Sequence, residues 1–438
     1  MKEKNTTQTA ENGFKETEIG LIPIDWDIDK LGKYCEVFSG NAFKSSDFAE
    51  KGVLIVKIGN LQDGTIVVDN RTNYYPKTID ESLKKFVLKK EDVLIALTGA
   101  TTGKVAVVPE KFEGSLLNQR VGKFNIFDKK LDNSFFRFFS ITSRFQDDIK
   151  GNILKSAQGN VSPKKIEQLM IIFPTFSEQQ KIAFVLSKIQ QVIEQQNKII
   201  QTTKELKKSL MNKLFTEGLH DEEQKETEIG LIPKNWDVIK LGDVFEIQQG
   251  KQLSSKFQKG ISPYPFLRTA NVLWGRIDIS TVDLMDFTPE EVAKLTLKQE
   301  DLLVCEGGDI GRTAIWDGQL SPCLYQNHLH RLRPLQKDIF PRFYMYWMQV
   351  AHLYLGIYAG TGNITTIPNL SQSRLRLFLL PKPSFDEQKE IANILSSIDK
   401  KLTQSEARKQ TLQALFKTML NQLMIGKIRV KDLDIEAS

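Results

Sequence analysis

The sequence predicts an α+β fold: two similar mixed α/β modules joined by two long antiparallel coiled-coil helices, arranged as a pseudo-twofold internal repeat. Two observations predict this fold. The chain repeats itself at an offset of 210 residues, and each copy closes with a long run of apolar residues at helical spacing. A period of that length corresponds to a whole domain with its connector, because solenoid units are far shorter.

The repeat is clearest where each copy begins. Residues 15–34 and 225–244 are identical at 14 of 20 positions, and both contain the phrase KETEIGLIP followed by a tryptophan. Further matching blocks follow in the same order: 54–60 with 266–272, 88–96 with 297–305, and 169–189 with 375–398. Between these blocks the copies diverge, as in SLLNQRVGKF at 115–124 against SPCLYQNHLH at 321–330. A shared frame with unlike inserts predicts two similar modules that recognise different things.

Within each copy, short β-branched and aromatic runs alternate with Gly, Asn and Asp. This texture predicts a mixed sheet or barrel-like α/β module with some helix, and it leaves the sheet topology open. The predicted organisation is a flexible N-terminal tail (1–14), a first module (15–175), a first helical region (176–220), a second module (221–383), a second helical region (384–430) and a C-terminal tail (431–438).

The two helical regions each carry one apolar seam with alternating three- and four-residue spacing. The predicted pairing residues are Ile182, Leu186, Ile189, Ile193, Ile200 and Leu210 in the first region, and Ile391, Leu395, Ile398, Leu402, Leu412 and Met419 in the second. A long helix must bury such a seam, so we expect the two helices to pair antiparallel as a rod of roughly 60 Å. Two unrelated dimerisation helices are the alternative. Ser177 with Gln180 fits a capping box at the start of the first helix.

Composition gives weaker guidance. The net charge of +6 permits a polyanionic partner without requiring one. Cys35, Cys305 and Cys323 form no CxxC pair and are expected to be reduced thiols. The first residues lack the apolar core of a signal peptide, and no apolar stretch approaches the ~20 residues of a membrane span. We therefore expect a cytoplasmic protein with no membrane partner.

The sequence offers little for catalysis. It lacks the N/D-P-P-Y/F loop of a DNA methyltransferase and a Walker lysine loop. Glu387-Gln388-Lys389 has the letters of a nuclease motif but lies at a predicted helix start, where capping or partner contact is favoured. His328-x-His330 could ligate a metal, although no further ligand stands beside it. We expect a non-catalytic chain that binds neither metal nor cofactor.

The order module, helix, module, helix resembles the specificity subunit of type I restriction–modification systems. So do the paired phrases GLIPIDWDIDKLG and GLIPKNWDVIKLG, and the paired helix starts PTFSEQQKIAFVLSKI and PKPSFDEQKEIANILSSI. The resemblance implies two target recognition domains that each read half of a split DNA sequence. It implies that the paired helices, the conserved helical regions, set the gap and dock two copies of a modification subunit that methylates adenine. S-adenosylmethionine is expected in that partner, and restriction (translocase/endonuclease) subunits are a further partner that the resemblance leaves open.

Candidate DNA contacts are the side chains suited to base edges and phosphates that fall between strands at matched places in the two copies. In the first module these are Lys44, Ser45, Lys57, Asn60, Thr101, Thr102, Lys104, Gln119, Arg120 and Asn160. In the second module they are Lys251, Gln252, Arg268, Asn271, Arg312, Asn327, His328, Asn363 and Thr365. Trp26 and Trp236 lie in the repeated opening phrase and are expected to be core anchors rather than stacking platforms.

The predicted function is sequence-specific binding of a bipartite DNA target within a type I restriction–modification complex. Two alternatives stay open at this point. The chain could be the DNA-recognition component of another restriction–methylation system, or a two-module adaptor that binds proteins. Salt-sensitive binding to duplex DNA separates the adaptor from the DNA readers.

Overall fold

The computed structural model describes residues 13–17, 20–62, 64–154, 160–254, 260–307, 310–356 and 370–434. The chain divides into two compact units, the first formed by Met1–Gln196 with Arg408–Ser438 and the second by Asn197–Ala407. Both boundaries fall inside the long helices, so each unit holds one module and one half of each helix. Among the described residues, no helix is long and apolar enough to cross a membrane.

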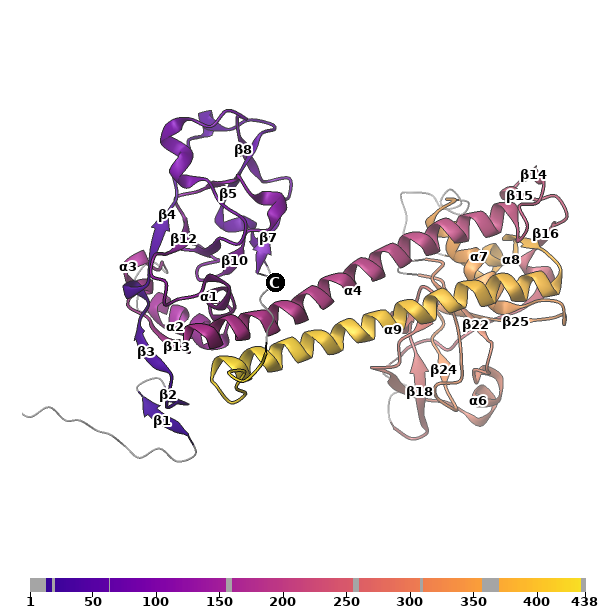
Figure 1. Cartoon of the computed structure of the whole chain (residues 1–438). Helices are drawn as coiled ribbons and strands as arrows, with labels where there is room; N and C mark the ends of the chain where they lie inside the picture. Colours follow the sequence, from indigo (N-terminus) through magenta and orange to yellow (C-terminus); the bar gives the residue numbers. More distant parts are fainter. Residues whose placement is uncertain are drawn as a thin grey trace, which may run out of the picture. The chain divides into compact units, whose positions relative to one another are not determined.

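The first unit is built on two small sheets (Figure 1). One is antiparallel with strand order β10-β9-β12-β4, and the other has order β11-β5-β8 with β11 parallel to β5. Their bounds are β4 Cys35–Ser39, β5 Val53–Val56, β8 Asn73–Tyr75, β9 Val93–Ala96, β10 Val105–Val107, β11 Leu116–Leu117 and β12 Val121–Ile126. Helices α1 (Asn133–Phe139), α2 (Ser143–Leu154) and α3 (Pro163–Glu167) follow.

The second unit repeats this topology strand for strand. Its sheets have the orders β17-β25-β22-β23 and β21-β18-β24, with β18 parallel to β24. Their bounds are β17 Phe245–Gln249, β18 Pro263–Leu267, β21 Asp283–Asp286, β22 Leu302–Cys305, β23 Thr313–Ile315, β24 Leu324–Tyr325 and β25 Leu329–Pro334. Its helices before the last long one are α5 Leu241–Val244, α6 Pro289–Leu295, α7 Pro341–Leu353 and α8 Gln372–Arg376. The mixed α/β modules predicted from the sequence are confirmed.

Each module starts with a two-stranded hairpin. The strand that follows the hairpin pairs with the last strand of the module. The hairpins are β1 (Phe14–Thr17) with β2 (Gly20–Pro23), and β14 (Gln224–Thr227) with β15 (Gly230–Pro233). Strand β3 (Asp27–Lys30) pairs antiparallel with β13 (Met170–Phe173), and β16 (Asp237–Lys240) pairs in the same way with β26 (Leu379–Lys382). Two-stranded β6 (Leu61–Gln62) with β7 (Thr65–Ile66), and β19 (Val272–Leu273) with β20 (Arg276–Ile277), complete the set.

One inner strand of each four-stranded sheet, β9 or β22, is buried on both faces, which explains its unbroken apolar sequence. We term β9 and β22 the central strands. In β9, Val93 and Ile95 belong to the core beside α1 and α2, whereas Leu94 and Ala96 belong to a second core beside β5. In β22 the same alternation places Leu302 and Val304 in one core and Leu303 and Cys305 in another. In each module this strand therefore lies between two hydrophobic cores.

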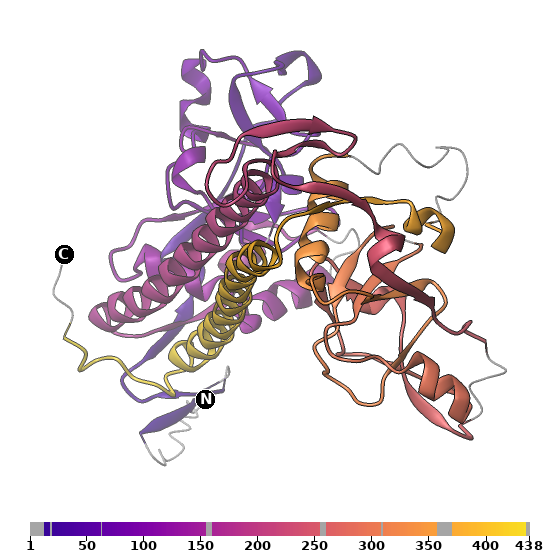
Figure 2. The ribbon, with the colours of Figure 1, turned by 90° about the vertical axis from the view of Figure 1, so that its right-hand side faces the viewer.

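The two long helices are α4 (Phe176–Glu217) and α9 (Phe385–Met424), which run side by side (Figures 1 and 2). In the first unit, Ile182 and Leu186 near the start of α4 share a core with Leu423 near the end of α9. In the second unit, Phe215 near the end of α4 shares a core with Leu395 near the start of α9. The predicted antiparallel pairing is thus confirmed inside each unit.

Polar contacts support the same pairing. In the second unit Lys204 Nζ lies 3.0 Å from Glu406 Oε1, and Lys207 Nζ lies 2.6 Å from Asp399 Oδ1. All twelve predicted seam residues are buried or half-buried.

The start of the first long helix differs from the sequence prediction. The backbone N–H of Glu178 donates to the hydroxyl of Thr175 at 3.3 Å, and that of Glu387 donates to the hydroxyl of Ser384 at 3.3 Å. The capping residue of α4 is therefore Thr175 rather than Ser177. The error arose because T-x-x-E and S-x-x-Q overlap in this stretch, and only the backbone shows which one begins the helix.

Candidate nucleic-acid interface

In the first module, backbone hydrogen bonds bring together several of the segments predicted to contact DNA. Gln119 N donates to Asn41 O at 2.8 Å, Leu97 N to Arg120 O at 2.9 Å, and Val161 N to Leu97 O at 3.0 Å. The hydroxyl of Thr101 donates to Ile58 O at 3.3 Å. Residues 40–41, 57–60, 97–104, 118–120 and 160–161 consequently form one group, which we term the first loop cluster.

The second module builds an equivalent group from the same bonds. Asn327 N donates to Lys251 O at 2.9 Å, Glu306 N to His328 O at 2.9 Å, and Leu370 N to Glu306 O at 3.0 Å. The Arg312 guanidinium donates to Thr269 O at 3.2 Å. We term residues 250–252, 268–271, 305–307, 310–312, 326–328 and 370 the second loop cluster.

A glycine after the first strand of each larger sheet allows this convergence. Gly40 follows β4 and lies against the backbone of residues 117–118. Gly250 follows β17 and lies against the backbone of residues 325–326. A Cβ atom at Gly40 would collide with the carbonyl oxygen of Leu117, and one at Gly250 with that of Tyr325. Close backbone approach therefore requires glycine at both positions.

Two of the predicted DNA contacts have a different role. Asn60 Oδ1 accepts from Lys57 N at 2.9 Å while its Nδ2 donates to Val67 O at 2.9 Å. Asn271 Oδ1 accepts from Arg268 N at 2.8 Å while its Nδ2 donates to Asp278 O at 2.9 Å. Both asparagines are buried. The structure thus revises the prediction that these side chains face DNA, because their amides are already used to hold a turn.

Their neighbours Lys57 and Arg268 are also engaged. Lys57 Nζ donates to Asn73 at 2.6 Å and lies 4.2 Å from the centre of the Phe48 ring, and burial lowers its pKa. Arg268 Nη1 pairs with Asp283 at 2.8 Å but keeps 45% of its side chain exposed. Arg268 is therefore the more available of the two matched cations.

The repeated tryptophans meet the repeated glutamates. Trp26 Nε1 donates to Glu178 at 2.9 Å, and Trp236 Nε1 donates to Glu387 at 3.0 Å. Both indoles are fully buried, which confirms them as core anchors. The opening phrase of each module is thus in contact with the start of the long helix that follows the module, and the repeat contains both partners of this contact. Glu387, in the nuclease-like letters at 387–389, thus accepts a hydrogen bond from an indole at the start of α9.

The adjacent glutamines complete the contact. Gln179 donates to Pro174 O at 3.0 Å and accepts from Asp132 N at 2.9 Å, and Gln388 donates to Pro383 O and accepts from Phe340 N at the same distances. Both are almost fully buried. Each glutamine fixes the start of its long helix to the preceding helical part of the module.

The family model for the type I restriction modification DNA specificity domain matches residues 23–205 and again residues 233–414. The chain belongs to this family, with two copies of its domain. The specificity domains thus span each module together with part of the helix that follows it.

Several known proteins are similar to this chain over nearly its whole length. The putative type I restriction enzyme MjaX specificity subunit of Methanocaldococcus jannaschii is 28% identical over 429 residues, covering 96% of this chain and 98% of that protein. The type I restriction enzyme EcoBI specificity subunit of Escherichia coli is 22% identical over 422 residues, with 90% and 85% covered. The crystal structure of a type I S subunit from M. genitalium has a TM-score of 0.57 at 17% identity, with 91% and 96% covered.

The remaining predicted contacts of the two specificity domains fall into three groups. Exposed side chains are Lys44, Ser45, Lys104, Gln119, Arg120, Gln252 and His328, while Asn160 and Asn327 are half-buried. Others are engaged in their own module: the hydroxyl of Thr102 donates to Gly99 O, and Lys251 Nζ pairs with Glu291 at 2.6 Å. Asn363 and Thr365 lie outside the described residues.

The predicted pair His328 and His330 flanks Glu306, at 3.7 and 3.9 Å. Among the described residues, no three His, Cys, Asp or Glu side chains are arranged so that they could hold a metal ion.

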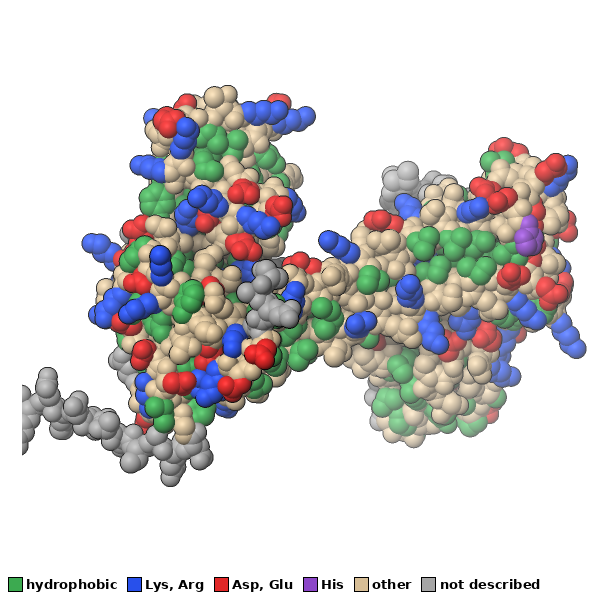
Figure 3. Space-filling view, viewed as in Figure 1, with side chains coloured by type: hydrophobic (Ala, Val, Ile, Leu, Met, Phe, Trp, Pro, Cys, Tyr) green, Lys and Arg blue, Asp and Glu red, His purple; other side chains and the backbone are tan. Residues whose placement is uncertain are grey.

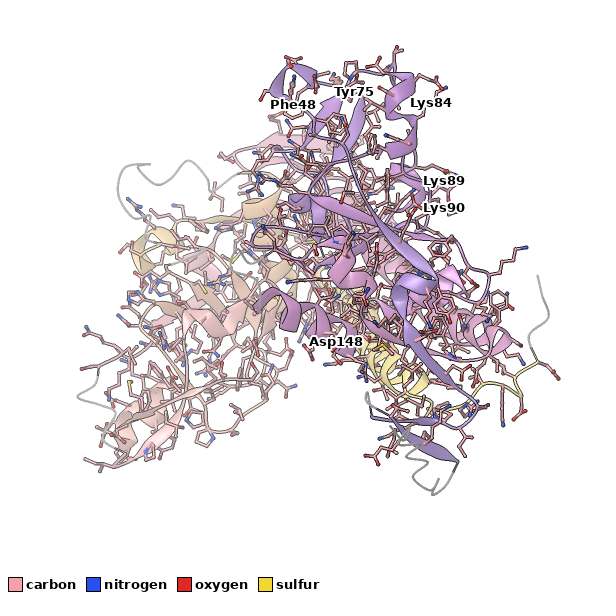
Figure 4. The ribbon with its side chains drawn as sticks, turned by 90° about the vertical axis from the view of Figure 1, so that its left-hand side faces the viewer. Phe48, Tyr75, Lys84, Lys89, Lys90 and Asp148 are labelled. Atoms are coloured by element: carbon pink, nitrogen blue, oxygen red, sulfur yellow. The ribbon has the colours of Figure 1, made fainter. Side chains whose placement is uncertain are left out.

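Two features of the specificity domains were not predicted from the sequence. Glu306 is buried in the second loop cluster where the first has Leu97, a difference visible when 88–97 is aligned with 297–306. A lysine edge also runs along the first module: Figure 4 places Lys84 at one end with Phe48 and Tyr75, and Lys89 and Lys90 farther along. Lys84 and Lys90 pair with exposed glutamates. Figure 3 likewise shows basic and acidic side chains mixed on one face of the first unit.

Proposed function

We propose that this chain reads a bipartite DNA sequence, one half with each loop cluster. The observation that carries the proposal is the matched pair of clusters, which share their backbone bonds and differ in their exposed side chains. Arg120 stands where the second module has His328, and Gln119 where it has Asn327. Such side chains suit base edges, while the surrounding turns offer backbone groups to phosphates. Membership of the DNA specificity domain family supports the same conclusion.

We further propose that the long helices dock two copies of a modification subunit, which supplies S-adenosylmethionine and methyl transfer. Each unit leaves apolar side chains of α4 exposed: Phe184 and Val192 in the first, Ile199 and Leu206 in the second. Figure 3 shows hydrophobic side chains gathered on the face of the second unit that carries the long helices. Apolar residues at seven- and eight-residue spacing suit a helical partner, and the internal repeat favours two copies. The relatives are named as specificity subunits of type I restriction enzymes, so restriction subunits would join the same complex.

The purified chain should bind duplex DNA in a strongly salt-dependent manner and should not transfer methyl groups alone. Each phosphate contact lowers the slope of log affinity against log salt by about 0.9, so several contacts give a steep line. Binding is measured by fluorescence anisotropy from about 50 to 200 mM salt, and methyl transfer with labelled S-adenosylmethionine, with and without the modification subunit.

A duplex of scrambled sequence is the control for specificity, since it retains the phosphates. Salt-insensitive or absent DNA binding would favour the protein-binding adaptor. Methyl transfer by the rigorously purified chain would contradict its assignment as a non-catalytic subunit.

A further inference from the structure

Arg120 and His328 occupy the same place in the two loop clusters. The carbonyl oxygen of each accepts from the residue that follows the central strand, Leu97 N or Glu306 N, at 2.9 Å in both modules. Arg120 is exposed and makes no ion pair with any residue in the described part of the chain. The His328 side chain is 52% exposed. Each is thus available at the centre of its cluster, and the two differ in chemistry.

The buried residues next to Arg120 and His328 also differ between the two modules, at two neighbouring positions. In the first module a Cβ atom on Gly122 would lie 2.7 Å from Val37 Cγ1 and 3.3 Å from Leu97 Cδ2, so Gly122 packs closely against apolar side chains that include Leu97. In the second module the register replaces Gly122 with His330 and Leu97 with Glu306. An apolar contact under Arg120 has become a buried polar group under His328.

Three side chains lie around the Glu306 carboxylate. Its Oε2 accepts from Gln249 Nε2 at 3.1 Å and lies 3.7 Å from His328 Nδ1 and 3.9 Å from His330 Nε2. His330 is buried, and its Nε2 lies at hydrogen-bond distance, 3.0 Å, from Leu370 O. That carbonyl can only accept, so Nε2 carries the His330 proton. The exposed His328 is therefore the group whose proton the Glu306 carboxylate can direct.

A carboxylate beside one nitrogen of a neutral imidazole favours the tautomer with the proton on that nitrogen. The 3.7 Å between Glu306 Oε2 and His328 Nδ1 is longer than a hydrogen bond, so Glu306 acts through its charge and favours the tautomer with the proton on Nδ1 and Nε2 as an acceptor. The Arg120 guanidinium, in contrast, can only donate. The same position of the two loop clusters has opposite hydrogen-bond polarity.

We propose that residues 120 and 328 are the specificity-determining position of their modules: Arg120 donates to guanine, and His328 accepts from the exocyclic amino group of adenine or cytosine. Glu306 is the positioning residue for His328. The proposal rests on the proposed function, because it assumes that the loop clusters read base edges. The acceptors of guanine are O6 and N7, and the amino donors are N6 of adenine and N4 of cytosine.

The test begins with selection of randomised duplexes by the full chain at pH 8. Arg120→Ala should relax one base pair of one half-site, and His328→Ala one base pair of the other. The relaxed base is then replaced by an analogue, 7-deazaguanine for guanine or a base lacking the exocyclic amino group for adenine or cytosine. Each analogue should weaken wild-type binding by roughly 5- to 150-fold and should cost the corresponding alanine variant nothing further.

Glu306→Gln keeps the shape and removes the charge. It should relax the same base pair as His328→Ala with the thermal midpoint unchanged, a result that a purely structural role would not give. If it fails to fold, the exposed His328→Ala still decides the proposal. An unaltered half-site in His328→Ala, or an amino-lacking base that binds the wild type fully, would overturn it. A wild-type chain that selects no sequence at all would instead contradict the proposed function.

Discussion

Gly40→Ala should abolish recognition of one half-site and leave the other intact, and Gly250→Ala should do the reverse. At each position the added methyl group meets a backbone carbonyl rather than a flexible side chain, so the two loops must move apart. Overpacking of this kind costs about 1–3 kcal/mol, and more where the backbone cannot adjust. Selection of randomised duplexes should return sequences in which only the half read by the unaltered module is fixed.

Matched controls lie in the same clusters. Gly59 and Gly307 have no atom within 4 Å of an added Cβ and do not have a positive φ. Gly59→Ala and Gly307→Ala should therefore leave both half-sites unchanged. Loss of both half-sites in Gly40→Ala would mean that the modules do not read independently.

Arg429→Ala should selectively destabilise the first unit, by about 2–3 kcal/mol. The Arg429 guanidinium bridges Glu178 at 2.8 Å and Asp25 at 2.6 Å, and a backbone carbonyl beside it binds Lys181. Glu178 is almost fully buried, so removing its partner leaves an uncompensated carboxylate. Arg429 and Asp25 are partly exposed, which keeps the loss at the lower end. Hydrogen exchange in β9 and β12 should accelerate roughly 30- to 150-fold while β22 and β25 stay unchanged.

The second unit and an exposed pair provide the controls. Arg71→Ala breaks a solvent-exposed pair with Asp69 and should leave hydrogen exchange in both units unchanged. Equal acceleration of exchange in both units after Arg429→Ala would contradict a local role for this contact.

The matched glutamates should also respond oppositely to pH. Burial alone would raise the pKa of Glu178, but the hydrogen bonds from Arg429 and Trp26 outweigh it and lower the pKa. Its contribution is present above the unfolded value and is lost as the pH falls through the lowered one. Burial raises the pKa of Glu387, with only partial relief from Trp236. Acidification from pH 7 toward the unfolded value near 4.5 should therefore stabilise the second unit, whereas the first should lose stability at still lower pH.

Much of the fold could be predicted because the repeat is written in the residues that pack. Trp26 and Trp236, the apolar central strands and the helical seams all follow simple periodicities. The contact between Trp26 and Glu178 could not be predicted, since nothing local joins residues 152 positions apart. The helix cap was misplaced by two residues because two capping patterns overlap there.

The segments that converge in each loop cluster could be predicted from the sequence, whereas the side chains expected to contact DNA stay a prediction. The matched blocks identified the segments that converge in each cluster. Asn60 and Asn271 were misassigned because an amide that holds a turn and one that contacts a base look alike in sequence. Glu306 was missed although the two copies differ there, since its effect depends on Gln249 and His328 from other strands and loops.

Exchange of one module tests the central claim most directly, namely that each loop cluster reads its own half of one DNA target. Residues 38–170 are replaced by the equivalent segment of another family member, and the chimaera is assembled with its modification subunit. Sequencing of the methylated sites should show one half-sequence replaced by that of the donor and the other half-sequence unchanged. A target altered in both halves, or unaltered in both, would contradict the account.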